Sequence, residues 1–154
     1  MAEPRFRLAR RDDLPAILAL IADDVLGKAR EGDADAAVTA AFEAIEADPN
    51  NAIHVVEIDG AVVGCAQITF IPGLSRRGAW RAQIESVRVA SALRGRGLGR
   101  AFFAHLIEAA RTRGCGLVQL TSDKRRAEAH RFYGALGFTA SHDGFKMTLE
   151  GAGR

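Results

Sequence analysis

The sequence predicts a mixed α/β fold, in which about four helices flank a central sheet that is mostly antiparallel. Segments with strand-like and helix-like apolar spacing alternate in the order β-α-α-β-β-β-α-β-α-β-β. Strands in the first half follow one another closely, which favours antiparallel hairpins, whereas the intervening helices favour parallel pairing later. With 154 residues, of which 48% are hydrophobic, the chain can fill one core. We therefore expect a single domain over residues 1–154.

The first part of the chain predicts one strand and two helices, at residues 5–9, 12–24 and 34–47, with a loop over residues 27–33. Asp12 and Asp13 are N-cap candidates for the first helix, and Pro15 fits its first turn. The apolar residues of the second helix fall at helical spacing on one face, which should point inward: Val38, Ala41, Phe42 and Ile45.

A hairpin is the strongest local signal in the middle of the chain. Asp59-Gly60 joins strand-like runs at residues 53–58 and 61–71, and an Asp-Gly pair in that position favours a type I′ turn. After a loop over residues 72–78, residues 80–89 predict a strand that is long enough to be central.

Two further alternations of helix and strand complete the predicted fold. We expect a helix over about residues 98–113, a strand over residues 117–121, and a helix over residues 127–136 that ends at Gly137. Residues 138–141 and 145–149 are expected to form a closing strand pair around Asp143-Gly144.

Composition and charge point to no macromolecular partner. The formal net charge is +2 and the arginines cluster mainly in glycine-containing loops, whereas a nucleic-acid-binding surface usually carries a basic stripe. No apolar run reaches transmembrane length, and we expect a cytoplasmic protein that has no signal peptide and binds neither nucleic acid nor membrane. Cys65 and Cys115 are expected to be buried reduced thiols. The spacing of His54, His130 and His142 matches no ligand pattern, so we expect no metal site.

The most informative motif is Arg94-Gly95-Arg96-Gly97-Leu98-Gly99, which lies between a strand-like run and a helix-like run. The glycines let a ligand approach bare backbone N–H groups, and the positive end of the helix dipole points the same way. The flanking Arg94, Arg96 and Arg100 add positive charge. The turn therefore predicts a cradle for a pyrophosphate group.

Two common nucleotide motifs fit this turn poorly. A dinucleotide-binding fingerprint has the spacing G-x-G-x-x-G after the first strand, but here Gly95, Gly97 and Gly99 alternate after a later strand. A Walker loop ends in Gly-Lys-Ser/Thr, whereas Gly99 is followed by Arg100 and Ala101.

The chain resembles the GNAT superfamily of N-acetyltransferases in its motifs and in the order of its elements. The family signature Gln/Arg-x-x-Gly-x-Gly/Ala matches residues 94–99 at every defined position, and the preceding IESVRV resembles the family's fourth strand. The later AHRFYGALGF resembles the family's second hallmark, an aromatic-tyrosine pair followed by Gly-Phe. Within the superfamily, residues 120–149 look most like the aminoalkylphosphonate N-acetyltransferases. The resemblance implies a GNAT fold with parallel pairing at an acetyl-CoA cleft.

The resemblance implies acetyl-CoA as co-substrate. By analogy, the backbone of Val87 and Val89, on either side of Arg88, would pair with the pantetheine arm, and an N–H near Val87 would serve the developing oxyanion. The glycine turn would hold the pyrophosphate through Arg94, Gly95, Arg96, Gly97, Leu98, Gly99 and Arg100. Many relatives have an asparagine seven residues before the hallmark tyrosine, where this chain has Arg126. The pantetheine contact is then lost, or Arg126 reaches a coenzyme phosphate instead.

Two residues carry the expected chemistry. Glu85 is the candidate general base, directly or through a water, because partial burial in an apolar strand raises the proton affinity of a carboxyl group. The competing interpretation pairs Glu85 with Arg88 or Arg81. Ser86 should project from the opposite face, and a one-residue change of register would exchange the two. The resemblance makes Tyr133 the general acid for the coenzyme thiolate, in competition with a role as a core tyrosine.

The resemblance implies an acceptor pocket that is shaped by the first two helices and by the loop PGLSRRGAWR, where Trp80 would wall the pocket and Arg77 and Arg81 would bind a carboxylate or phosphonate. We expect direct acetyl transfer to a primary amine of a small molecule, because neither cysteine has a basic partner for a covalent route. Two alternatives stay open: acetylation of a protein N-terminus or lysine, and a non-catalytic acyl-CoA-binding sensor or interaction module. Dimers are common in the family, so the resemblance is compatible with a homodimer.

Overall fold

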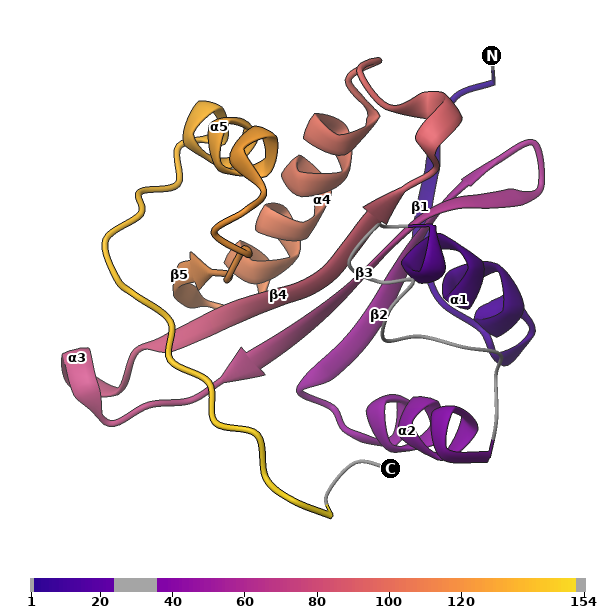
Figure 1. The fold of residues 1–154 in the computed structure, drawn as a ribbon. Helices are drawn as coiled ribbons and strands as arrows, with labels where there is room; N and C mark the ends of the chain where they lie inside the picture. Colours follow the sequence, from indigo (N-terminus) through magenta and orange to yellow (C-terminus); the bar gives the residue numbers. More distant parts are fainter. Residues whose placement is uncertain (1, 24–35, 152–154) are drawn as a thin grey trace. The chain divides into compact units, whose positions relative to one another are not determined.

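The computed structural model describes residues 2–23 and 36–151, and the expected loop over residues 27–33 lies outside them (Figure 1). The chain divides into two compact units, Met1–Gln119 and Leu120–Arg154. The first unit carries a five-stranded sheet in the order β1-β2-β3-β4-β5. The single domain over residues 1–154 stays a prediction.

The sheet is mixed, as the sequence predicts. Its strands are β1 (Arg5–Leu8), β2 (Asn51–Ile58), β3 (Ala61–Ile71), β4 (Trp80–Val89) and β5 (Cys115–Gln119). The first four pair antiparallel in succession, and only β4 and β5 run parallel. The hairpin at Asp59-Gly60 is confirmed, and its φ angles of 50° and 79° are the two positive values that a type I′ turn requires.

Helices cover both faces of this sheet (Figure 1). The unit contains α1 (Leu14–Ala22), α2 (Ala36–Ala47), the short turn α3 (Ser75–Gly78) and α4 (Leu98–Thr112). Neighbouring residues of a strand point to opposite faces. His54 of β2 contacts His105 of α4, whereas the adjacent Val55 packs in a cluster with Ile17 and Leu20 of α1. Consequently α4 lies on one face of the sheet and α1 on the other.

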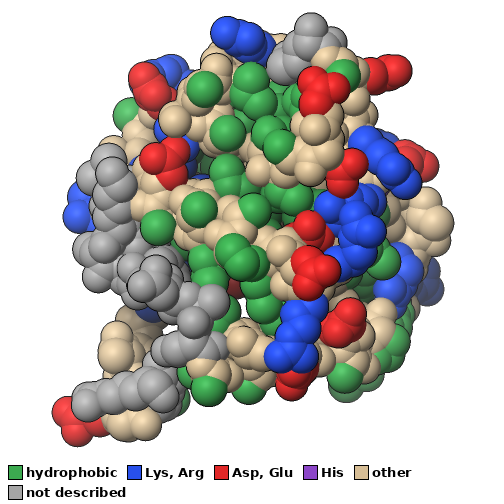
Figure 2. All heavy atoms as spheres, turned by 90° about the vertical axis from the view of Figure 1, so that its right-hand side faces the viewer, with side chains coloured by type: hydrophobic (Ala, Val, Ile, Leu, Met, Phe, Trp, Pro, Cys, Tyr) green, Lys and Arg blue, Asp and Glu red, His purple; other side chains and the backbone are tan. Residues whose placement is uncertain are grey.

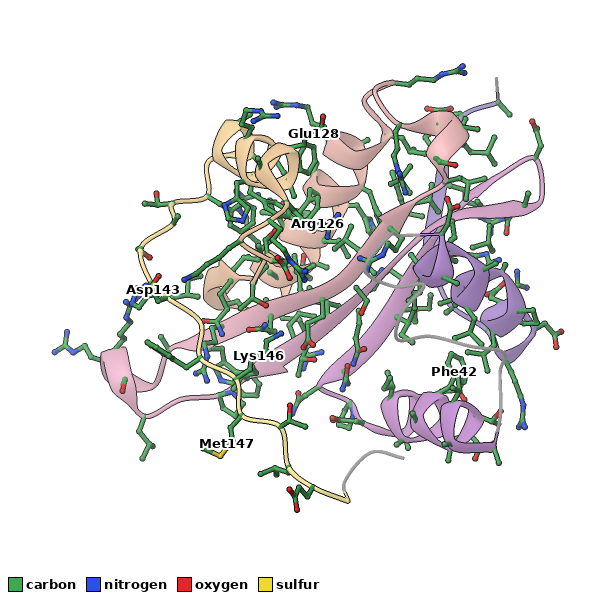
Figure 3. All side chains as sticks on the ribbon, in the orientation of Figure 1. Phe42, Arg126, Glu128, Asp143, Lys146 and Met147 are labelled. Atoms are coloured by element: carbon green, nitrogen blue, oxygen red, sulfur yellow. The ribbon has the colours of Figure 1, made fainter. Side chains whose placement is uncertain are left out.

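Helices α4 and α2 differ in how completely they bury their apolar residues. Phe102, Phe103 and Leu106 of α4 are completely or almost completely buried. On α2, Phe42 (labelled in Figure 3) is buried and Val38 and Ile45 are half-buried, but Ala41 is exposed, so the expected inner face is wrong at that residue. Fewer residues of α2 are buried than its apolar spacing predicts.

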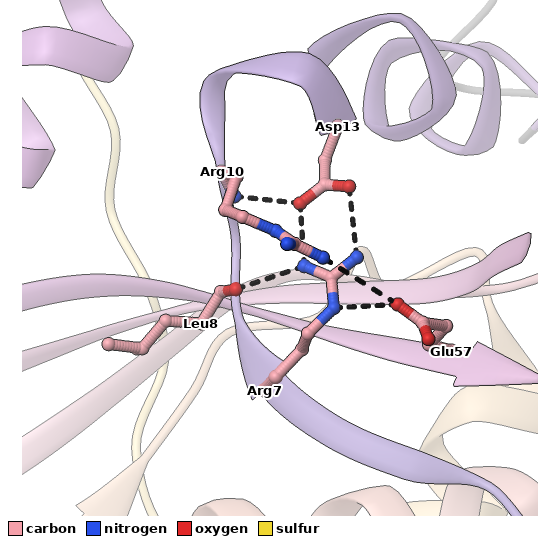
Figure 4. Close-up of polar contacts among 5 residues, drawn as sticks. All are labelled: Arg7, Leu8, Arg10, Asp13 and Glu57. Atoms are coloured by element: carbon pink, nitrogen blue, oxygen red, sulfur yellow. Dashed lines mark hydrogen bonds and ion pairs between the residues drawn. The ribbon is translucent and has the colours of Figure 1, made fainter. Parts of the chain in front are cut away.

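Asp13 stands at the N-cap position of α1, as expected, but its carboxylate does not cap that helix. Instead it accepts hydrogen bonds from the backbone N–H of Arg10 (2.7 Å) and from both terminal nitrogens of Arg7 (2.8 and 3.0 Å). Arg7 also donates through Nε to Glu57 of β2 at 2.7 Å (Figure 4). These bonds fasten β1, the 3₁₀ turn Arg11–Asp13 and β2 together, and the Arg7 guanidinium holds the pKa of Asp13 below its usual range.

The second unit contains α5 (Ala127–Leu136), which ends at Gly137 with φ of 102°, as the sequence predicts. The expected strand pair at residues 138–141 and 145–149 is wrong, because neither segment forms a strand in the structure. Phe145, Met147 and Leu149 still alternate as in a strand, yet all are exposed. Alternation predicts an extended backbone but does not supply a hydrogen-bonding partner, and a short isolated hairpin is marginal in water.

Candidate functional site

The site is built on the end of β4 that β5 leaves uncovered. The parallel pairing of β4 with β5 runs from Trp80 opposite Cys115 to Gln83 opposite Gln119. It ends two residues before residue 121, where the sequence predicted the end of that strand. Residues 84–89 of β4 therefore have no partner on that edge within the sheet that the structure describes. Backbone N–H and C=O groups on an open strand edge need partners, so this edge can pair with an extended ligand.

A β-bulge lies in the same stretch. On β3, Gln67 pairs with Glu85 and Cys65 pairs with Arg88, so two residues of β4, Ser86 and Val87, oppose one residue of β3. Ser86 has φ of 53°, which is rare for a residue with a side chain. The bulge interrupts the alternation of faces. The expectation that Glu85 and Ser86 point to opposite faces therefore fails, because it assumed a regular strand.

A small cavity of about 60 Å³ adjoins the bulge. Its lining is mostly apolar and includes two polar residues: Ile17, Ile21, Ile53, Cys65, Ala66, Gln67 and Ser86. A volume of this kind needs roughly 10–15 Å³ to hold one water molecule, so the cavity can hold several. Gln67, which the sequence reasoning did not single out, thus lies between this cavity and its strand partner Glu85.

Glu85 itself is exposed, so the partial burial expected for it is absent. Within the described residues it forms no ion pair, and the competing pairing with Arg81 or Arg88 is not observed there. Its carboxylate is therefore open to solvent and to an approaching ligand.

Both cysteines are poor nucleophiles at neutral pH. Burial raises the pKa of the Cys65 thiol to about 12, an effect that Arg88 only partly offsets. Burial also raises the pKa of Cys115. Each therefore stays a thiol; Cys65 is buried as expected, whereas Cys115 is only half-buried, so the expected burial is wrong for Cys115.

The glycine turn leads directly into α4. Gly97 is the N-cap residue of the helix with φ of 82°, and Gly95 has φ of 77°. A glycine carries no side chain that could bond the first N–H groups, and the first turn of α4 contains no acidic residue. Leu98 is buried and anchors the turn, whereas Arg94, Arg96 and Arg100 are exposed. The result is an open, positively charged helix N-terminus that suits an anion.

Two backbone carbonyls near this turn are occupied by arginines. Arg88 donates to the carbonyl of Val87 at 2.9 Å, and Arg94 donates to that of Val89 at 3.2 Å. Arg94 also lies 4.0 Å from the carboxylate of Asp23. A carbonyl oxygen has two lone pairs, so a ligand N–H can bond to either carbonyl beside the guanidinium group or in its place.

The predicted acceptor residues separate in space. Trp80 and Arg81 are consecutive in β4 and point to opposite faces, so one pocket on a single face cannot use both side chains. The Arg81 guanidinium lies beside Gly73, close to where a Cβ would stand. Arg77 lies in α3 with φ of 62° and is exposed.

The remaining predicted site residues belong to the second unit. Tyr133 is half-buried in α5, and its ring meets those of Phe132 and Phe138 edge-on at 5.6 and 5.9 Å. Arg126 holds the N-cap position of α5 (Figure 3), where its backbone N–H donates to the carbonyl of Asp123.

Several features of the described residues bear on partners. On the face seen in Figure 2, acidic and basic side chains are interspersed and form no stripe of one sign. No helix in residues 2–23 or 36–151 is both long and apolar enough to cross a membrane. Those residues also contain no cluster of three or more His, Cys, Asp or Glu side chains able to hold a metal ion. His54 instead contacts His105, with Nδ1 and Nε2 3.0 Å apart.

The fold of the chain is similar to that of a solved GNAT family acetyltransferase from Staphylococcus aureus, with a TM-score of 0.77 and 16% identity over 97% of this chain and 100% of that one. The family model described as "Acetyltransferase (GNAT) family" matches residues 15–138. The chain belongs to this family of acyltransferase enzymes, which use acetyl-CoA.

Two curated relatives have names that describe N-acetyltransferases of small amines. A glucosamine 6-phosphate N-acetyltransferase from Trypanosoma brucei brucei is 36% identical over 90 residues, which cover 58% of this chain but only 59% of that protein. An aminoalkylphosphonate N-acetyltransferase from Salmonella typhimurium is 32% identical over 108 residues, 70% of either chain. A crystal structure described as a transcriptional regulator from Bacillus halodurans C-125 is 44% identical, with a TM-score of 0.92 over 96% of this chain and 100% of that one.

Proposed function

We propose that the chain transfers an acetyl group from acetyl-CoA to the primary amine of a small molecule. The observation that carries this proposal is the open edge of β4 at residues 84–89, which leads straight into the glycine turn at the start of α4. An extended chain with amide groups can pair with such an edge, and a pyrophosphate fits such a helix start. Acetyl-CoA carries both parts in that order.

On the donor side, the residues of the turn hold the pyrophosphate in this proposal. The N–H groups of Gly97, Leu98 and Gly99 point along the helix axis, and Arg94, Arg96 and Arg100 supply mobile positive charge. Val87 and Val89 pair with the pantetheine arm, whose amide N–H groups bond to these carbonyls beside or in place of the guanidinium groups of Arg88 and Arg94.

The chemistry is a direct attack. The amine nitrogen forms a bond to the thioester carbon while the carbon–sulfur bond breaks, and the ammonium proton passes to Glu85, directly or through a water. Tyr133 is the proposed proton donor to the departing thiolate, a role that rests on the aromatic-tyrosine motif. The raised pKa of Cys65 supports the direct route, because a covalent acyl-enzyme needs a thiolate.

The acceptor is proposed to be a small amine, since both curated relatives are named for small amines. Arg81 at the start of β4 is the proposed contact for an anionic group on it, with Arg77 and Trp80 as further candidates. A non-catalytic acyl-CoA sensor is the second candidate, because a structure 44% identical to this chain is described as a transcriptional regulator.

The test is a turnover screen in which free coenzyme A is measured with a panel of amino sugars, aminoalkylphosphonates, polyamines and peptides. We expect turnover with a small amine, a lower kcat with an altered pH profile for Glu85→Gln, and a lower kcat for Tyr133→Phe. Peptides as the best substrates would favour the protein acetyltransferase alternative. Tight acetyl-CoA binding without turnover on the whole panel would favour the sensor.

The donor site has its own test. Replacing Arg94, Arg96 and Arg100 together by glutamine should weaken acetyl-CoA binding and flatten its dependence on salt. If the affinity measured by calorimetry is unchanged, the glycine turn is not the pyrophosphate site.

A further inference from the structure

Four neutral polar side chains form a continuous row across β2, β3, β4 and β5. The register places Asn51 opposite Thr69, Thr69 opposite Gln83, and Gln83 opposite Gln119. Directly paired residues share a face of the sheet, and two hydrogen bonds confirm it here. Thr69 Oγ1 donates to Asn51 Oδ1 at 3.3 Å, and Gln119 Nε2 donates to Gln83 Oε1 at 2.7 Å. We call these four residues the amide row.

Gln67 and Glu85 form a second pair two residues further along, on the same face. Gln67 also donates to Asn51 Oδ1, at 3.1 Å, which links the pair to the amide row. Together the two rows use every glutamine in the chain. The residues that alternate with these positions on β3 and β4 are buried on the opposite face of the sheet: Ile68, Phe70, Ala82 and Ile84.

The amide row and the neighbouring Gln67 keep unused hydrogen-bonding capacity. A side-chain amide offers two N–H donors and one acceptor oxygen. Within the described residues, the amide nitrogens of Asn51 and Gln83 and the amide oxygen of Gln67 bond to no protein group. These side chains are half-buried, and Glu85 and Gln119 are exposed. A ligand can therefore reach a surface on which donors and acceptors alternate around a single carboxylate.

We propose that the amide row is the acceptor-binding surface and that it selects a primary amine carrying several hydroxyl groups. This inference rests on the proposed function. Hydroxyl groups both donate and accept, so they match side-chain amides, whereas an alkyl chain would leave the amides unpaired. The ammonium group is placed at Glu85. Strands about 4.8 Å apart and same-face residues about 7 Å apart along a strand give the surface the dimensions of a sugar ring.

The same surface disfavours a compact aminoalkylphosphonate. Its anionic group would lie within a few ångströms of its own ammonium, and hence beside the Glu85 carboxylate. Arg81 shares this face but is four residues from Glu85, roughly 13 Å along the strand. An anionic group could reach Arg81 only from the far side of a larger, ring-sized acceptor.

A binding experiment can test whether a ligand contacts the amide row, and it does not depend on turnover. The chain has three glutamines and two asparagines, so a nitrogen–proton correlation spectrum contains five side-chain amide pairs. Titration with glucosamine should shift the signals of Asn51, Gln67 and Gln83, and leave Asn50, whose oxygen accepts from Arg113, nearly unchanged. Cyclohexylamine, a ring of the same size without hydroxyl groups, should shift them far less. Equal shifts with both amines, or none with glucosamine, would overturn the proposal.

A kinetic test uses matched variants. Thr69→Val removes one hydroxyl at constant shape, and Thr69→Ser retains it; Gln83→Leu removes one amide. We expect Thr69→Val and Gln83→Leu to raise the KM for glucosamine about tenfold, with the KM for acetyl-CoA and the kcat little changed. Thr69→Ser, which retains the hydroxyl, should raise the KM for glucosamine less than Thr69→Val does. The proposal is wrong if aminoethylphosphonate or a peptide is the better substrate, or if the variants affect cyclohexylamine equally. A failure of the proposed function would give a different result: no amine would be acetylated and acetyl-CoA would not bind, regardless of the outcome of the glucosamine titration.

Discussion

Gly97→Ala separates the stability of the glycine turn from its proposed role. Gly97 has φ of 82°, and a Cβ built there meets no atom within 4 Å. The substitution therefore creates no clash inside the protein, and its cost is the left-handed backbone, about 1–2 kcal/mol. A bound pyrophosphate would meet the new methyl group. Losing one charge-assisted backbone contact costs about 1.5–3 kcal/mol, which weakens acetyl-CoA binding roughly 10- to 100-fold.

Gly60→Ala is the matched control. Gly60 has φ of 79° and equally empty surroundings, but it lies in the β2–β3 hairpin. Both variants should lose the same stability in urea unfolding, followed through the fluorescence of Trp80. Only Gly97→Ala should lose affinity for acetyl-CoA in calorimetry. Equal affinities in the two variants would refute the assignment of the turn to the pyrophosphate.

Two further predictions concern stability. Arg7→Met should lower the free energy of unfolding in urea by about 2–4 kcal/mol, because it leaves the largely buried carboxylates of Asp13 and Glu57 without their cation. The control is Arg11→Met, which removes the exposed pair of Arg11 with Glu43 and should cost less than about 1 kcal/mol. Equal losses in the two variants would contradict the burial argument. Burial, helped by His105, lowers the pKa of His54 from 6.5 to about 4. Between these two values the unfolded chain takes up a proton that the folded protein refuses, so stability is full above about pH 6.5 and falls as the pH drops toward 4. His54→Phe should reduce that fall in unfolding measurements at pH 7, 5.5 and 4.5, and an unchanged pH dependence would show that His54 is not its source.

Local signals predicted most of the elements correctly. Asp59-Gly60 fixes its turn through the backbone preferences of two residues, and α4 and α5 follow from apolar spacing with a glycine at one end. Each of these signals acts over a few neighbouring residues, so it survives in any tertiary context.

Signals that depend on a partner were less reliable. The alternation of Phe145, Met147 and Leu149 predicted a strand, but in residues 2–23 and 36–151 no neighbouring strand pairs with this segment. The strand expected at residues 117–121 lies at Cys115–Gln119, because its bounds depend on which residues of β4 it pairs with. A strand is a property of a pair, and one sequence segment specifies only half of it.

The sequence by itself determined the family, the acetyl-CoA motif and the candidate residues Glu85 and Tyr133, since these depend on residue types at fixed spacing. Only the tertiary structure decided that β4 has a bulge at Ser86, at which residue its pairing with β5 ends, and which side chains meet across the sheet. Three glutamines far apart in the chain carry no visible pattern until the register places Gln83 between Thr69 and Gln119 and Gln67 beside Glu85. Strand register is set by long-range pairing, and for that reason the proposed acceptor surface could not be predicted from local sequence.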